Sequence, residues 1–97
     1  MSVEKTLIER GSRYGIMENN AELTQRLIKI VINHEHKRED LTPMHLECLH
    51  MIFHKISRMI NGDIWYSENM HDIGGYAKLL EEFQIAHLQN KKEPDDT

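Results

Sequence analysis

Acidic side chains on two predicted helices have a spacing that could bind a divalent metal ion. Glu68 and Asp72 are four residues apart, so their carboxylates share one helix face, and Glu47 and His50 are three apart on the preceding helix. Carboxylate oxygens are ligands that Mg²⁺ and Mn²⁺ prefer. If the two helices pack antiparallel, these pairs could face each other. The sequence therefore predicts a Mg²⁺ or Mn²⁺ site, with Glu47 and Asp72 as catalytic carboxylates.

Basic and aromatic side chains close to these carboxylates could bind a substrate that carries phosphate. Lys55 and Arg58 could hold phosphate oxygens. Arg13 and Tyr14 stand between two glycines in a segment that could reach a ligand. Tyr14 or Trp65 could stack on a base. The alternative for Tyr14 is that its ring packs on the core beside a turn.

One side of the same predicted helix is polar along its length. Its residues repeat at steps of three and four: Glu47, His50, His54, Arg58 and Asn61. Such a stripe is the expected solvated face of an amphipathic helix. Asn61 is also a candidate for substrate binding. His50 and His54, with Glu47, have a spacing that zinc sites use, which gives a further alternative.

The basic and acidic residues near the helix break also have a purely structural interpretation. In an antiparallel pair of helices, residues near the break meet first. Lys55 and Arg58 would then form salt bridges to Glu68 and Asp72. This arrangement predicts that the stability of the protein does not depend on a metal ion.

Four helices are predicted to position these residues, which makes the fold all-α, a bundle of three main helices with a short N-terminal one. Apolar residues at steps of three and four place the helices at about 2–10, 20–34, 42–61 and 67–89. The predicted N-caps are Ser2, Asn19 or Asn20, Thr42 and Ser67. Gly11 and Gly62 are predicted to end the first and third helices. Gly74 and Gly75, inside the fourth, indicate a close approach of a helix or a ligand.

Length and composition limit the possible classes of protein. The 97 residues predict one helical domain, residues 1–90, followed by a polar tail, residues 91–97. The net charge is -4 and no basic run is present, which argues against nucleic-acid binding. No apolar stretch approaches the roughly 20 residues of a membrane span. A single cysteine, Cys48, indicates a core thiol in a reducing cytosol, and the small core predicts a homodimer.

Three segments, taken in order, resemble a family of small phage and prophage proteins. They are residues 9–15 (ERGSRYG), 51–63 (MIFHKISRMINGD) and 71–77 (HDIGGYA). That family in turn is similar to the all-α nucleoside-triphosphate pyrophosphatases of the MazG-like group. The resemblance implies an oligomeric helical enzyme that binds Mg²⁺ through acidic residues on two helices. Such an enzyme cleaves a nucleotide to its monophosphate and pyrophosphate.

The MazG-like motif carries Glu-x-x-Glu on one helix and Glu-x-x-Asp on the next. In this sequence the first half falls on Glu47-Cys-Leu-His50, with histidine in place of the second glutamate. The second half falls on Glu68-Asn-Met-His-Asp72, which has one additional residue. The resemblance thus implies Glu47, Glu68 and Asp72 as metal ligands, joined by His50.

Two functions follow from these observations. The first is binding of nucleoside triphosphates with a divalent metal, with or without hydrolysis, in the cytoplasm of a bacterial host. The second is a non-catalytic phage protein that binds a host or phage protein, because a fold does not fix a function. A nucleotide with Mg²⁺ should raise the melting temperature only under the first.

Overall fold

The computed structural model describes residues 2–34 and 39–92, with side chains as far as residue 90. Over these ranges the regular secondary structure is α-helix throughout. The helices are α1 (Val3–Tyr14), α2 (Met17–Ile32), α3 (Pro43–Asn61) and α4 (Glu68–Lys92). The predicted all-α class is confirmed. No helix in this part of the chain is both long and apolar enough to cross a membrane.

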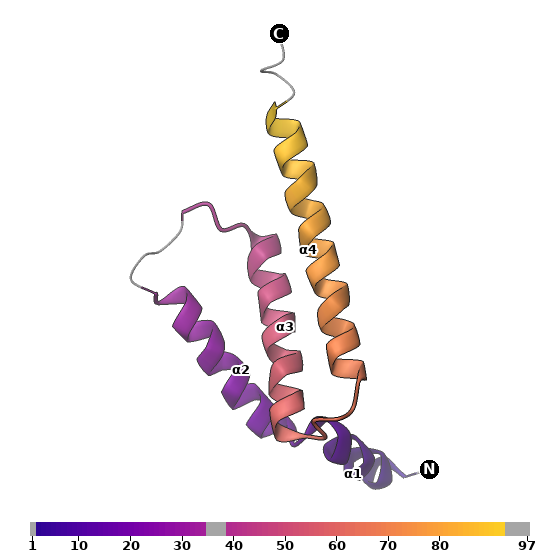
Figure 1. Cartoon of the computed structure of the whole chain (residues 1–97). Coiled ribbons are helices and arrows are strands. Elements are labelled where there is room, and N and C mark those ends of the chain that lie inside the picture. The colour runs from indigo at the N-terminus through magenta and orange to yellow at the C-terminus, as the bar shows by residue number, and fades with distance from the viewer. Residues whose placement is uncertain (1, 35–38, 93–97) are drawn as a thin grey trace.

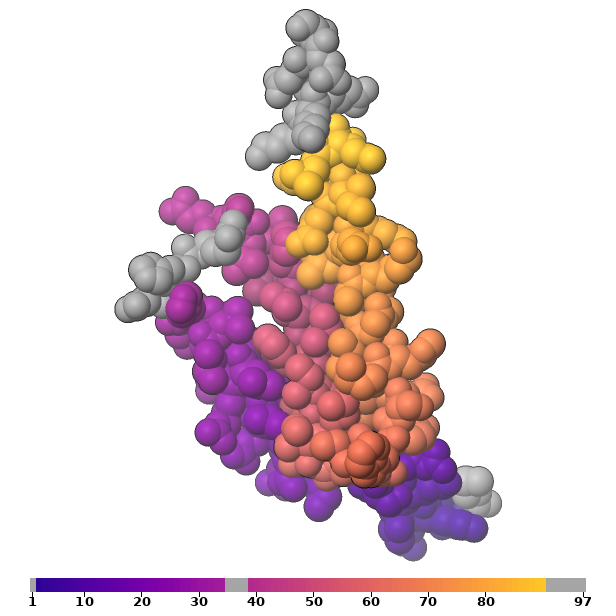
Figure 2. Space-filling view, in the orientation of Figure 1, coloured from indigo at the N-terminus to yellow at the C-terminus, as the bar shows by residue number. Residues whose placement is uncertain are grey.

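Helix α3 lies between α2 and α4, and both neighbours run antiparallel to it (Figure 1). Thr24 of α2 hydrogen-bonds to Ser57 of α3, and Lys55 of α3 pairs with Asp72 of α4. The three helices therefore form a flat layer, with α1 crossing the end where α3 finishes. The chain measures 63 × 30 × 22 Å. The last turns of α4 project beyond the other helices (Figure 2).

Two helix starts follow from local capping, as predicted. The Ser2 hydroxyl accepts a hydrogen bond from the Lys5 backbone N–H at 3.1 Å. At α3, Thr42 accepts from the His45 backbone N–H at 3.3 Å, and Pro43 occupies the first turn. Proline has the φ angle that this position needs and lacks an N–H that would have no partner there.

The predicted end of the first helix at Gly11 is wrong. Helix α1 continues through Gly11 to Tyr14 and stops at Gly15, whose φ of 80° lies in the region open to glycine. A glycine inside a helix costs only about 1 kcal/mol, so it does not end a helix by itself. The segment between the two glycines, which could reach a ligand or form a turn, is instead the last turn of α1.

Gly62 ends α3 as predicted, but it does not adopt the left-handed conformation that glycine often has at a helix end. Its φ is −120°, which other residues also adopt. Its requirement for glycine comes from packing, because a Cβ there would lie 2.5 Å from the Arg13 carbonyl oxygen and 2.7 Å from the Gly15 nitrogen. At Gly15, a Cβ would lie 2.6 Å from the Asn61 carbonyl oxygen. The turn after α1 and the turn after α3 are thus in direct backbone contact.

The predicted cap at Asn19 or Asn20 is also wrong. Helix α2 starts at Met17, with Ile16 at the N-cap, so both asparagines lie within its first turns. Asn20 is 2% exposed. Its side chain donates to the Tyr14 carbonyl at 2.6 Å and accepts from the Asn61 side chain at 3.1 Å. The residue that looks like a local cap therefore connects α1, α2 and α3.

Polar side chains occupy the most enclosed positions of the layer. Asn20, Thr24, Ser57 and Asn69 are the largest side chains with less than 2% exposure. Among the described residues, Cys48 is the only apolar residue in the buried class, at 3% exposure, as expected for a core thiol. The hydrogen bonds of Asn20, Thr24 and Ser57 connect α2 to α3. The apolar side chains of the layer are only partly covered.

The expected close approach to Gly74 and Gly75 does not occur among the residues that the structure describes. A Cβ added at either position would meet no atom within 4 Å. Both glycines lie on exposed parts of α4. Contacts among the described residues therefore do not explain this pair.

Candidate anion site at the helix junction

Two tyrosines and three arginines gather where α1, α3 and the connection to α4 meet. The rings of Tyr14 and Tyr66 pack edge to face, with centroids 5.6 Å apart. The guanidinium of Arg58 lies 4.7 Å from the Tyr14 centroid, and that of Arg13 lies 5.0 Å from the Tyr66 centroid. Arg10 lies 5.8 Å from the Tyr14 centroid. Such cation–π contacts are weak at an exposed site and stronger where water is excluded.

Backbone hydrogen bonds hold this junction cluster (Arg10, Arg13, Tyr14, Arg58 and Tyr66) together. The Asp63 N–H donates to the Arg13 carbonyl at 3.1 Å, which ties the connection after α3 to the end of α1. The Tyr66 N–H donates to the Asp63 carbonyl at 3.1 Å and forms a tight turn. This turn places the Tyr66 ring beside Tyr14. The site therefore depends on the backbone contact of Gly15 and Gly62.

Hydrogen bonding stabilises the protonated forms of Tyr14 and Arg13 in the junction cluster. A hydrogen bond to Tyr66 raises the pKa of Tyr14 above its ordinary value, and burial raises it further. A hydrogen bond to the same Tyr66 raises the pKa of Arg13. At neutral pH Tyr14 is therefore uncharged and Arg13 is charged. The cluster presents fixed positive charge beside aromatic rings, which suits an anionic ligand with a planar group.

His54 lies on the same side of α3 as Arg58 and is uncharged at neutral pH. Burial lowers its pKa, and the positive charges of Arg58 and Lys55 lower it further. The neutral imidazole adds no positive charge to this side of the layer. Of the predicted substrate-binding residues, Arg13, Tyr14 and Arg58 come together, whereas Asn61 bonds to Asn20 between α2 and α3.

Asp72 is held by Lys55, as the structural interpretation of these residues predicts. The Lys55 Nζ lies 2.9 Å from the Asp72 Oδ2, and the two side chains are 11% and 31% exposed. The hydrogen bond from Lys55 lowers the pKa of Asp72 below its ordinary value of 3.8. Arg58, the other predicted partner of the acidic residues, lies over Tyr14.

The Lys55–Asp72 pair should make stability depend on pH. Because the pKa of Asp72 is lower in the folded state, the pair stabilises the fold above the ordinary carboxyl pKa. This contribution is lost as the pH falls through the lowered value. Urea unfolding from pH 7 to pH 3 should therefore show a smaller acid-dependent loss in Lys55→Met than in the native protein. The control is Lys78→Met, since Lys78 forms an exposed pair with Glu82 at 3.5 Å; equal profiles for native protein and Lys55→Met would contradict the assignment.

The four predicted metal ligands do not converge. Lys55 of α3 pairs with Asp72 of α4, and Glu47 precedes Lys55 by eight residues, or about 12 Å along the helix. Because α4 is antiparallel, Glu68 lies in the opposite direction from the pair. Within the described ranges, no three His, Cys, Asp or Glu side chains lie close enough to hold a metal ion. For the same reason, Glu47, His50 and His54 do not form the zinc site that their spacing allowed.

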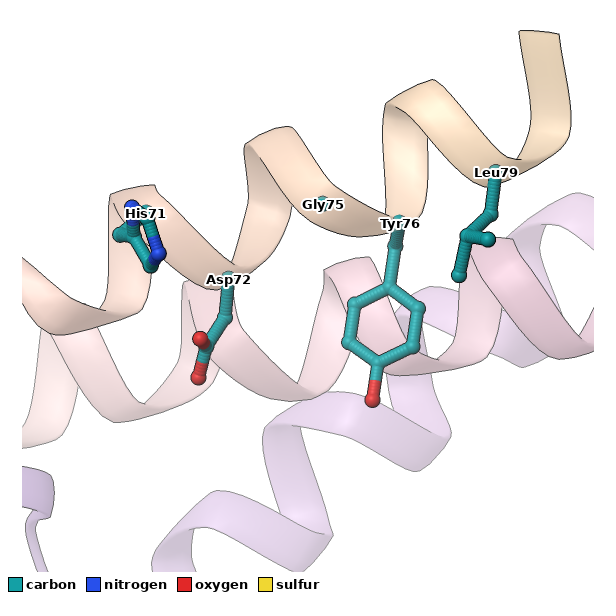
Figure 3. Close-up of a pocket in the computed structure, with 5 residues that line it drawn as sticks. All are labelled: His71, Asp72, Gly75, Tyr76 and Leu79. Atoms are coloured by element: carbon teal, nitrogen blue, oxygen red, sulfur yellow. The ribbon is translucent and has the colours of Figure 1, made fainter. Parts of the chain in front are cut away.

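An open surface hollow lies beside Asp72 on α4. His71, Asp72, Gly75, Tyr76 and Leu79 line it (Figure 3). Asp72, Tyr76 and Leu79 point to the same side of α4, and Gly75 leaves a gap between them. Because Lys55 already pairs with Asp72, the carboxylate is not free to act as a general base without breaking that pair.

Tyr66 is the site residue that sequence reasoning missed. Trp65, its neighbour, is the predicted stacking residue, but it is 89% exposed and lies outside the junction cluster. No periodic pattern covers the break between α3 and α4, so the sequence does not distinguish the two aromatics. The nearby glycines were the available signal, because Gly15 and Gly62 each end a helix and follow the cluster residues closely.

The fold and the junction cluster define an all-helical protein with an open three-helix layer and a positively charged aromatic site at one end. Comparison with protein-family models, curated proteins and solved structures found no match.

Proposed function

We propose that this chain is a non-catalytic interaction protein whose helical layer binds a second protein surface through exposed apolar side chains. One observation carries the proposal: fifteen large apolar residues in the described chain are exposed, nine of them on α2, α3 and α4, while Cys48 is the only buried apolar residue among those described. Folded chains usually enclose large aliphatic side chains. Interfaces of permanent complexes resemble a domain core cut in half. The layer has that character.

The positions of the carboxylates support binding over metal-dependent hydrolysis. A MazG-like mechanism requires acidic side chains from two helices around one metal ion. Here Asp72 pairs with Lys55, and Glu47 and Glu68 lie in opposite directions from that pair. Measured along the helix axes, the distance from Glu47 to Lys55 and the distance from Asp72 to Glu68 add up to roughly 18 Å. The three helices form an open layer, and the binding partner would cover the open face of that layer and complete the bundle predicted from the sequence.

The test is the native mass of the tagged chain in an extract of the cells that express it. We expect a species clearly larger than the 11.5 kDa chain. Replacing Ile30 and Ile60, two exposed apolar residues of the layer, with lysine should return it to monomer mass. A native chain that sediments as a monomer in the extract would overturn the interaction function.

A second candidate function is binding of a nucleotide or a similar aromatic anion at the junction cluster. The specific observation is that Arg13, Arg58 and Arg10 surround the paired rings of Tyr14 and Tyr66. This arrangement offers charge for phosphate and faces for a base. It requires no carboxylate-bound metal ion.

Loss of Arg58 should abolish any thermal stabilisation by a nucleotide. Nucleoside triphosphates at millimolar concentration should raise the melting temperature of the native protein with or without Mg²⁺, because binding to the folded state stabilises it. Arg58→Ala should lose the shift, since Arg58 lies closest to a ring of the cluster. The control is Arg26→Ala, an exposed position on α2. No shift of the native protein with any nucleotide rules out this candidate.

A further inference from the structure

The two unpaired flanks of α3 differ in chemistry. Ser57 faces α2 and Lys55 faces α4. The two residues are two positions apart, so their side chains point in directions that differ by about 200° around the helix axis. One flank between these directions carries Glu47, His54 and Arg58. The other flank carries His45 at its first turn and then, along its centre, Leu49, Ile52, Ile56 and Ile60.

The aliphatic flank of α3 continues onto both neighbouring helices. On α4, Asp72 lies on the same side of the layer as Arg58, close enough for the guanidinium charge to act on its carboxylate. The opposite side of α4 therefore carries Met70, Ile73 and Ala77. Helix α2 runs parallel to α4 but packs on the opposite side of α3. The α2 residues on the same side of the layer as Met70, Ile73 and Ala77 are therefore Leu23, Leu27 and Ile30. We name these ten residues the apolar face: Leu23, Leu27, Ile30, Leu49, Ile52, Ile56, Ile60, Met70, Ile73 and Ala77.

Several members of the apolar face are left open to solvent by the chain itself. Ile30 is 68% exposed, Ile60 is 59% exposed and Met70 is 56% exposed. They come from three different helices, so each of the three helices of the layer contributes an exposed apolar side chain to this face. A contiguous apolar surface of this kind marks a contact site.

The chain exposes more surface than a compact monomer of its mass would, and the excess is comparable to the area that one partner of a permanent dimer hides. The whole chain exposes 7811 Å². A compact monomer of 11.5 kDa would expose about 5,800 Å². The excess is roughly 2,000 Å², and permanent dimers bury from about 1,000 Å² on each partner upwards.

We propose that the apolar face binds the apolar face of a second copy of this chain, so that two three-helix layers stack into one six-helix assembly. The proposal rests on the interaction function above and names its partner. A two-fold contact brings the same patch of each copy together, which requires a surface that does not repel itself. The apolar face has no charged residue, although the chain carries a net charge of -4. The junction cluster and the Lys55–Asp72 pair remain on the outer side of each layer.

Stacking would also complete an ordinary domain architecture. Stable domains consist of two packed layers around one apolar core. A single layer of α2, α3 and α4 lacks the second layer. In the dimer, Ile52 and Ile56 at the centre of α3 would lie between the layers and form that core.

The test is the mass of the purified full chain in solution, by light scattering on a sizing column at about 50 μM. The native protein should have twice the chain mass of 11.5 kDa. The double variant Ile30→Lys/Ile60→Lys should be a monomer. Both residues are more than half exposed, so the lysines can be solvated without disturbing the helices, and circular dichroism should stay helical. The matched control is Leu79→Lys/Ile85→Lys, at 50% and 49% exposure and outside the apolar face, which should remain a dimer.

Each other outcome overturns the proposal in a different way. A monomeric native protein at this concentration excludes the second copy. If a larger species nevertheless exists in the cell extract, the interaction function stands and its partner is a different protein. A dimer that persists in the face variant but dissociates in the control excludes this face as the interface.

Discussion

Replacing Gly15 with alanine should reduce the free energy of unfolding by about 3 kcal/mol or more. At φ 80° and ψ 178° this residue occupies a conformation that is essentially restricted to glycine, which costs other residues about 1–3 kcal/mol. The added Cβ would also lie 2.6 Å from the Asn61 carbonyl oxygen and 2.7 Å from its carbon. These are backbone atoms of α3, so relief requires a shift of a whole helix end, which adds a further cost of about 1–3 kcal/mol.

Urea unfolding at one fixed protein concentration measures this effect, because the stability of an associating chain depends on concentration. The matched control is Gly11→Ala, in the same helix, where a Cβ meets no atom within 4 Å. That variant should gain about 0.5–1 kcal/mol, because alanine is the better helix residue. If Gly15→Ala and Gly11→Ala behave alike, the contact between the two turns is not present in solution.

Replacing Asn20 with alanine should cost about 2–3 kcal/mol. The change removes the donor to the Tyr14 carbonyl at 2.6 Å and the acceptor of the Asn61 amide at 3.1 Å. Both partners lose a hydrogen bond in an enclosed place, where water replaces it poorly. The neighbouring Asn19 is exposed, and Asn19→Ala should stay within about 0.5 kcal/mol of the native protein.

Chemical denaturation of Asn20→Ala, with the same readout for Asn19→Ala, separates a buried contact from a change in helix propensity. A loss confined to Asn20→Ala supports the network. Equal small effects in the two variants would mean that the side chain of Asn20 is solvated. Near-ultraviolet circular dichroism of the tyrosines would show whether the junction cluster loosens at the same time, because Asn20 holds the carbonyl of Tyr14.

The elements that the sequence predicted well have local causes. The capping of α1 by Ser2, and of α3 by Thr42 with Pro43, depends on residues within one turn of each other. The pair of Lys55 and Asp72 also follows from antiparallel packing across a short break. Such features can be derived from spacing alone, because few other arrangements satisfy them.

The errors arose where a distant contact decides the outcome. Gly11 and Gly15 offer the same local signal, but only Gly15 touches the end of α3. Asn20 resembles a cap until the Tyr14 carbonyl and the Asn61 amide give it buried partners. No spacing rule brings Tyr66 to Tyr14 either, because the whole of α2 and α3 lies between these two residues in the sequence. The resemblance to MazG-like enzymes remains a prediction, and so do the metal, nucleotide and phage interpretations that depend on it.

The contact between the turn after α1 and the turn after α3 has a consequence for the order of folding. It joins Arg13 to Asp63, fifty positions further along the chain. The entropy cost of closing so long a loop falls once α2 and α3 have paired as a hairpin, because the ends of the loop are then already close. We therefore expect the helical hairpin to form before the junction. The charged aromatic cluster then forms only after the chain extends through Tyr66, and a nascent chain that ends before Asp63 cannot bind anything there.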